Sequence, residues 1–256
     1  MDKRLGFDAV PEIYDRVRPR YPDDLFDHLF ALLPERPEII EVGPGTGQAT
    51  RALLARGARV HAIELGPNLA TRLRENLPSA DLRISVGDFE RIPNENSIAD
   101  ALVSATAYHW IPAPANVDRP AALLLPGGAV AIVDTVQITS DADQGFFEAC
   151  QPIYERYGEG HTGPPAPTED RVDPPMRAAL DADARFVDAD LRTYRWDQAY
   201  SAAAYRDLML SYSGTQAMTE PARSGLLDDM ERFITAEFDG EITRPLVVAL
   251  TTARRR

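Results

Sequence analysis

The segment Glu41-Val42-Gly43-Pro44-Gly45-Thr46-Gly47 is the most informative part of this sequence of 256 residues. The apolar run over 38–43 is typical of a buried β-strand, and residues 47–56 have the apolar spacing of a helix. Glycines at such a turn accept positive φ and let the backbone approach a ligand closely. Because the helix that follows presents unpaired N–H groups and the positive end of its dipole, we expect a polar ligand here.

Strands and helices alternate on both sides of this loop. We predict helices over 25–33, 47–56, 67–77, 114–125, 143–157, 199–213 and 220–238, and strands over 38–43, 59–64, 81–86, 98–104, 129–134, 185–196 and 243–252. Apolar strands separated by helices favour a parallel sheet covered on both faces. The glycine- and proline-rich residues 158–175 predict a long loop, of the kind that often serves as a lid.

Composition excludes several classes of partner. A net charge of −13 repels a phosphate backbone, and the basic tail Arg254-Arg255-Arg256 is typical of a solvated chain end, so we expect no nucleic acid. No apolar run approaches the ~20 residues that cross a bilayer, and no signal-peptide core follows Met1. With Cys150 as the one cysteine, no intramolecular disulfide can form. We therefore expect a cytoplasmic protein without a membrane partner.

The spacing of the glycines distinguishes between two cofactor classes. A dinucleotide loop has the pattern G-x-G-x-x-G, which places its third glycine at position 48, where this chain has Gln48. The observed pattern is G-x-G-x-G preceded by Glu41, and this resembles the first motif of class I S-adenosylmethionine-dependent methyltransferases. A nicotinamide-dependent oxidoreductase and a catalytically silent adenosyl-cofactor-binding protein are the alternatives.

Three further positions carry the same resemblance, each at the carboxyl end of an expected strand, where open α/β sheets bind ligands. The resemblance implies that Glu64 accepts from the ribose hydroxyls, that Asp88 accepts from the adenine amine, and that Phe89 lines the adenine pocket. The segment 104–110 is expected to pass beneath the methionine part of the cofactor. The complete cofactor-binding set is Glu41, Gly43, Gly45, Gly47, Glu64, Leu65, Asp88, Phe89, Ala105, Tyr14 and Arg18.

The resemblance covers residues 39–134 well and also gives the expected architecture. It implies a Rossmann-like, doubly wound, mostly parallel seven-stranded sheet with an antiparallel last strand and a helical cap. We expect one methyltransferase domain over 1–256, which comprises a helical lead-in (1–36), a cofactor-binding core (37–139) and a substrate-shaping region (140–256). Among small-molecule enzymes the chain looks most like the trans-aconitate and ubiquinone-pathway methyltransferases, an impression carried by Tyr14…Arg18-Pro19-Arg20-Tyr21-Pro22, His109-Trp110 and Trp196…Tyr205.

Methyl transfer from a sulfonium is an in-line displacement, which chiefly needs aligned reactants and the exclusion of water. A general base is required only where the acceptor carries a proton that must leave, and His109 is our candidate because imidazole titrates near neutrality. We expect Tyr21, Trp110 and His161 in the pocket of a small-molecule acceptor. No histidine–carboxylate cluster has the spacing of metal ligands, so no metal is expected.

Overall fold

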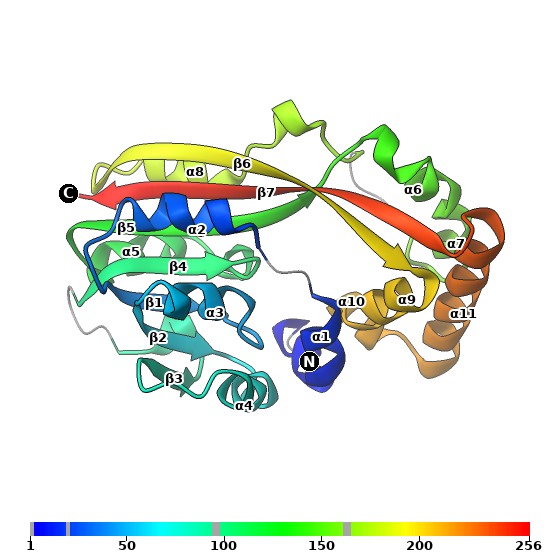
Figure 1. The fold of residues 1–256 in the computed structure, drawn as a ribbon, viewed down its shortest axis with the longest axis horizontal. Helices are drawn as coiled ribbons and strands as arrows, with labels where there is room; N and C mark the ends of the chain where they lie inside the picture. Colours follow the sequence, from blue (N-terminus) through cyan, green and yellow to red (C-terminus); the bar gives the residue numbers. More distant parts are fainter. Residues whose placement is uncertain (1–2, 19–20, 94–97, 161–164) are drawn as a thin grey trace. The chain divides into compact units, whose positions relative to one another are not determined.

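The computed structural model describes residues 3–18, 21–93, 98–160 and 165–256 (Figure 1). The chain divides into two compact units, each assembled from segments that are far apart in the sequence. The sheet unit contains Arg20–Thr135, Asp173–Tyr194 and Val248–Arg256, and the helical unit contains Met1–Pro19, Val136–Val172 and Arg195–Val247. The single domain over 1–256 stays a prediction.

The strands form a sheet in the order β3-β2-β1-β4-β5-β7-β6, as Figure 1 shows. The pairs β1–β2, β2–β3, β1–β4 and β4–β5 are parallel, while the last strand, β7, is antiparallel. This confirms the expected Rossmann-like, seven-stranded architecture. The strands are β1 Glu38–Val42, β2 Arg59–Glu64, β3 Leu82–Val86, β4 Ala99–Ala105, β5 Leu124–Gln137, β6 Phe186–Ser201 and β7 Glu241–Arg255.

The helices of the sheet unit follow local signals in the sequence. Helix α3 begins directly after Gly47, whose φ of 103° is favourable only for glycine, and α4 begins at Pro67, which needs no N–H partner in a first turn. The described helices are α2 Asp23–Phe30, α3 Gln48–Ala55, α4 Pro67–Asn76, α5 Ala115–Leu123 and α8 Pro175–Asp181, with the 3₁₀ turns η2 Phe89–Arg91 and η3 Tyr108–Trp110.

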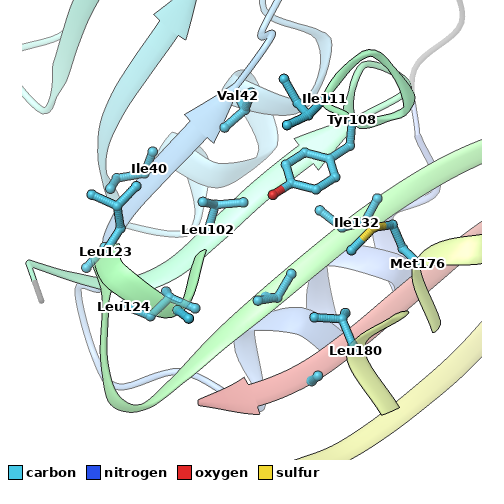
Figure 2. Close-up of a cluster of buried hydrophobic side chains, with 14 of the residues drawn as sticks. Ile40, Val42, Leu102, Tyr108, Ile111, Leu123, Leu124, Ile132, Met176 and Leu180 are labelled. Carbon is cyan, nitrogen blue, oxygen red and sulfur yellow. The ribbon is translucent and has the colours of Figure 1, made fainter. Parts of the chain in front are cut away.

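A buried cluster joins β1, β4 and β5 to α5 and α8 in the sheet unit. In Figure 2 the Tyr108 ring lies among its aliphatic members, near Ile132 and Met176. Burying each such large side chain stabilises the fold by about 1.5–3 kcal/mol. The cluster therefore gives the strand ends of this unit a rigid support.

The helical unit has a separate core. The Phe146 ring packs edge-on against Tyr205 and Phe238, with both ring centroids 5.3 Å from its own. The elements of this unit, apart from the parts of β5–β7 that reach it, are η1 Lys3–Ala9, α1 Pro11–Val17, η4 Asp141–Asp143, α6 Phe146–Ala149, α7 Gln151–Arg156, η5 Glu169–Arg171, α9 Ala202–Leu210, α10 Ser213–Ala217 and α11 Glu220–Glu237. No described helix in either unit is long and apolar enough to cross a membrane.

Several expected boundaries were wrong. The helix over 143–157 is two short helices, because Pro152 starts a new first turn after Cys150. Strand β5 begins at Leu124 rather than 129, and an irregular register against β4 together with Gly127 at φ 80° accommodates the extra residues. The expected loop 158–175 contains η5, ends where α8 begins, and includes residues 161–164, which lie outside the described residues.

Candidate functional site

In the sheet, β2 and β3 lie on one side of β1, whereas β4 and β5 lie on its other side. The strand order therefore changes direction between the neighbouring strands β1 and β4. Ligands of open α/β sheets bind at the carboxyl ends of the strands at such a point. Ser104 Oγ donates a 2.7 Å hydrogen bond to the carbonyl oxygen of Val42, and Gly43 N donates a 2.9 Å bond to Ile63 O. These bonds fix the carboxyl ends of the adjacent strands β4, β1 and β2 relative to one another. The glycine loop begins at the carboxyl end of β1.

The glycine loop is shaped by close approach as well as by backbone conformation. Gly43, Gly45 and Gly47 have φ of 66°, 60° and 103°. A Cβ on Gly43 would lie 2.5 Å from Ala107 Cβ, and one on Gly47 would lie 2.7 Å from a Leu73 methyl. The loop therefore needs glycine at Gly43 and Gly47 for two independent reasons.

Glu64, the last residue of β2, is held by one N–H group of the glycine loop and one from the residue that precedes α4. Gly45 N donates to one carboxylate oxygen at 2.9 Å, and Gly66 N donates to the other at 2.8 Å. The side chain is 5% exposed. A carboxylate has about four acceptor positions, so a group held in this way can accept from a ligand hydroxyl as well as from the backbone.

Glu41 lies on β1 with its carboxyl group fully buried. Thr50 Oγ1 donates to Glu41 Oε2 at 2.6 Å, while Oε1 has no hydrogen-bond partner among the described residues. Burial raises the pKa of this carboxyl to about 7, and the nearby Glu64 carboxylate adds to the rise while Thr50 opposes it. An uncompensated carboxyl beside the glycine loop is suited to a cationic or hydrogen-bond-donating ligand.

The raised pKa of Glu41 predicts a pH dependence of stability. The carboxyl keeps its proton to about pH 7 in the fold and loses it near 4.5 in the unfolded chain. The folded state therefore binds more protons between these values, and the free energy of unfolding falls as the pH rises, by about 3 kcal/mol in total. Glu41→Gln lacks this fall, so its stability relative to wild type should improve from pH 4.5 to 7.5 in urea titrations.

Glu38→Gln is the matched control, because Glu38 lies on the same strand with its side chain 47% exposed. Its stability should follow that of the wild type over the same pH range. Parallel pH curves for Glu41→Gln and wild type would contradict the prediction.

At the end of β3, Asp88 and Phe89 have different environments. Asp88 is partly exposed and its Oδ1 accepts from Glu90 N at 3.0 Å, which caps the turn η2. The Phe89 ring is 3% exposed and lies beneath the Arg119 guanidinium, 4.8 Å from its centroid. Leu65, after β2, is partly exposed. Asp88 and Leu65 are accessible to a ligand, whereas the Phe89 side chain is part of the core.

The end of β4 carries a residue that the sequence did not single out. Thr106, directly after Ala105, has φ 56°, which is unusual for a β-branched residue. Its hydroxyl lies 2.9 Å from Tyr21 OH and 3.2 Å from Thr135 Oγ1, and its N–H donates to Val133 O. These contacts hold the strained backbone and bring Tyr21 to this strand end.

The turn η3 presents His109 and Trp110. Tyr108 is 2% exposed and donates from its hydroxyl to Asn116 O at 2.9 Å, so it anchors the turn in the core shown in Figure 2. His109 is exposed, Trp110 is partly exposed, and their ring centroids are 5.1 Å apart. Partial burial of the imidazole lowers the pKa of His109. The ring is therefore mainly neutral at pH 7, as a proton acceptor must be.

Asp134 on β5 is a titratable group that sequence reasoning missed. It is the last residue of the expected strand 129–134, next to Thr135, and burial raises the pKa of its carboxyl. Its position near a strand end was the available signal. Among the described residues, no group of three or more His, Cys, Asp or Glu side chains is arranged to hold a metal ion.

Two of the expected cofactor contacts, Tyr14 and Arg18, belong to the helical unit. The Arg18 guanidinium lies over the Tyr14 ring at 4.7 Å and over the Tyr212 ring at 5.1 Å. Contact of this pair with a cofactor stays a prediction. His161 lies outside the described residues.

The residues of the sheet unit fit S-adenosylmethionine. Glu41 Oε1, which is buried and has no partner in the described part of the chain, forms an acidic strand edge together with the carboxylates of Glu64 and Asp88. Such an edge suits a ligand that carries cationic groups and hydroxyl donors. Gly43 has a different role, because its missing Cβ lets the loop pack against Ala107 after β4.

Comparison with known proteins agrees with this geometry. Residues 40–132 match the family model described as a methyltransferase domain. The chain is 28% identical to the uncharacterized methyltransferase Rv3342 of Mycobacterium tuberculosis, over 91% of this chain and 87% of that protein. The chain is an S-adenosylmethionine-dependent methyltransferase. This methyltransferase is thus not the oxidoreductase that a glycine loop could also have indicated.

Solved structures show the same fold. The methyltransferase resembles BH2331 of Bacillus halodurans with a TM-score of 0.56 and 18% identity, over 91% of this chain and 99% of the other. It also resembles phosphoethanolamine N-methyltransferase 2 of Haemonchus contortus in complex with S-adenosyl-L-methionine, with a TM-score of 0.55 and 15% identity. That match covers 98% of this chain and 57% of the other. At such identities the likeness concerns the fold.

Proposed function

We propose that this enzyme methylates a small-molecule acceptor, with the cofactor seated at the carboxyl ends of β1, β2 and β3. The observation that carries the proposal is the acidic strand edge beside the glycine loop, where Glu64 is fixed by the N–H groups of Gly45 and Gly66. The net charge of −13 also favours a small acceptor over a nucleic acid. The trans-aconitate and ubiquinone-pathway enzymes remain the groups that the motifs most resemble.

In this proposal each residue of the strand edge has a distinct role. Glu64 accepts from the ribose hydroxyls, Asp88 accepts from the adenine amine, and the backbone of the glycine loop passes close to the methionine part. S-adenosylmethionine supplies an activated methyl group when bound. The residues of the chain orient the reactants, and such positioning contributes about 7–11 kcal/mol to lowering the barrier.

His109 is the proposed general base for an acceptor that carries a proton. Its imidazole is accessible and mainly neutral at pH 7, because partial burial lowers its pKa. Tyr21, held by Thr106, and Trp110, stacked near His109, are the proposed acceptor contacts of the sheet unit. His161 is kept as a proposed acceptor contact from the sequence.

A metabolite screen tests the proposed function. Purified enzyme is incubated with S-adenosylmethionine and pools of small hydroxy, amino and carboxylic compounds, and mass spectrometry follows the gain of one methyl group. The proposal expects enzyme-dependent methylation together with S-adenosylhomocysteine release. If S-adenosylhomocysteine binds but no pool is methylated, the chain is better described as a catalytically silent cofactor-binding protein.

His109→Ala should then lower kcat by about 10²-fold or more for a proton-bearing acceptor, because a positioned base contributes ~10²–10⁴-fold. The apparent KM should change little, since binding does not depend on the proton transfer. In the wild type, kcat should fall with decreasing pH and reach half its value below pH 6.5, because burial lowers the His109 pKa from 6.5 and the neutral form is the active one. His28→Ala, on α2, is the control. If His109→Ala keeps the kcat of the wild type, His109 is not a general base and its side chain only packs against its neighbours.

A further inference from the structure

The helical unit contains a cavity of about 980 Å³ that the proposed function does not use. Its wall includes the rings of Phe147, Tyr154, Tyr205 and Tyr212 together with the guanidinium of Arg244. Ligand pockets of about 300–1,000 Å³ that combine apolar walls with a few polar groups are typical of small-molecule sites. The chemistry of Arg244 indicates what such a ligand would be.

Among the residues that the structure describes, the hydrogen-bond partners of Arg244 on β7 are all neutral. Its Nη1 donates to Tyr212 OH at 2.8 Å, and its Nη2 donates to Gln137 Oε1 at 2.9 Å. Its Nε is buried and has no hydrogen-bond partner among the described residues. No carboxylate of the described residues forms an ion pair with this guanidinium either. A guanidinium has five N–H donors, so most of its capacity is unused.

A second cation lies close to the first. The Arg18 guanidinium lies 5.1 Å from the centroid of the Tyr212 ring, whose hydroxyl accepts from Arg244. Arg18 Nε is likewise buried without a partner in the described part of the chain, as is the hydroxyl of Tyr200. Two partly desolvated cations without a described counter-ion are costly, and an anion between the surrounding hydroxyls would offset that cost.

We propose that this cavity binds a small organic carboxylate, whose oxygens are held by the Arg244 guanidinium and by tyrosine hydroxyls. The planar fork of arginine matches the two oxygens of a carboxylate. The hydroxyls of Tyr154 and Tyr205, 3.2 Å apart, can rotate to donate toward the same anion. The rings of these tyrosines and of Phe147 then cover the carbon skeleton of the ligand.

Acidic residues of the cavity wall restrict the charge of the ligand. Asp141, Glu148, Glu155 and Glu159 all line the cavity with exposed side chains. They repel a second negative charge, so the site favours a single carboxylate over a dicarboxylate. The inference concerns binding to one unit and does not depend on methyl transfer.

Ligand-observed NMR tests the proposal with acetate, butyrate, benzoate and phenylacetate, each compared with its neutral amide. At least one carboxylate should bind about tenfold or more tightly than its amide, since a hydrogen bond from a guanidinium to a charged acceptor is stronger than one to a neutral acceptor. Glutarate should bind more weakly than butyrate. Equal binding of acids and amides, or no binding of any acid, would overturn the proposal.

Variants locate the binding in the cavity. Arg244→Gln should weaken carboxylate binding about tenfold or more and remove the preference over the amide, while Arg244→Lys keeps part of that preference. Arg206→Gln is the control, because Arg206 pairs with Asp228 and does not line the cavity. If Arg244→Gln does not fold, Tyr212→Phe serves, with an expected loss of several-fold. Unchanged carboxylate binding in the folded variant would refute the assignment.

Discussion

Glu64→Ala should bind S-adenosylhomocysteine at least about tenfold more weakly than the wild type, because a hydrogen bond to a charged acceptor contributes roughly 1.5–3 kcal/mol. The same substitution leaves the N–H groups of Gly45 and Gly66 without their acceptor. A buried donor without a partner costs about 1–3 kcal/mol, so the loss of the acceptor for two donors should also lower the free energy of unfolding by about 2–6 kcal/mol. Calorimetric titration and urea unfolding measure the two effects.

Glu75→Ala is the matched control on α4, where the side chain is 59% exposed and pairs with Arg72. Surface ion pairs of this kind contribute little, so both cofactor affinity and stability should stay near the wild type. Asp88→Ala tests the adenine contact separately, with a loss of affinity of about tenfold expected. Unchanged affinity in both Glu64→Ala and Asp88→Ala would remove the site assignment.

Gly43→Ala should lower the free energy of unfolding by about 2–4 kcal/mol, which combines a positive φ for alanine with over-packing. The added Cβ would lie 2.5 Å from Ala107 Cβ, and φ at this position is 66°. The loop would have to move away from β4, so cofactor affinity should fall as well. Urea unfolding and calorimetric titration report both changes.

Gly57→Ala separates the two causes of this destabilisation. Gly57 has φ 85°, but a Cβ there meets no atom within 4 Å. Its cost should be about 1–2 kcal/mol from the backbone conformation alone, with cofactor affinity unchanged. An equal cost at Gly43 and Gly57 would mean that the close approach to Ala107 has no energetic consequence.

The sheet was predictable because its signals are local. The apolar run 38–43, the glycine turn that begins at Gly43 and the helix that follows are each indicated by residues close together in the sequence. Strand β2 matches its predicted bounds of Arg59–Glu64. Helix α8 was missed because Pro174-Pro175 followed a glycine- and proline-rich stretch. Proline is also favoured in the first turn of a helix, and Pro175 is the first residue of α8.

The candidate site was predictable only for residues that a local sequence pattern specifies. Gly43, Gly45, Gly47 and Glu64 follow from spacing and from the strand ends. The strained Thr106 and its bond to Tyr21 depend on contacts 85 residues apart, which no local pattern encodes. The role proposed for Arg244 could not be predicted for the same reason. Its hydrogen bonds to Tyr212 and Gln137, in place of a carboxylate, arise only in the folded unit.

A crystal structure of the enzyme with S-adenosylhomocysteine would show whether the cofactor binds at the carboxyl ends of β1, β2 and β3. We predict that the ribose hydroxyls lie within hydrogen-bond distance of the Glu64 carboxylate, which keeps its bonds to Gly45 N and Gly66 N. We also predict that the adenine amine lies near Asp88. These predictions would be contradicted by an adenosine bound away from the carboxyl ends of β1 and β2, with Glu64 contacting only the backbone.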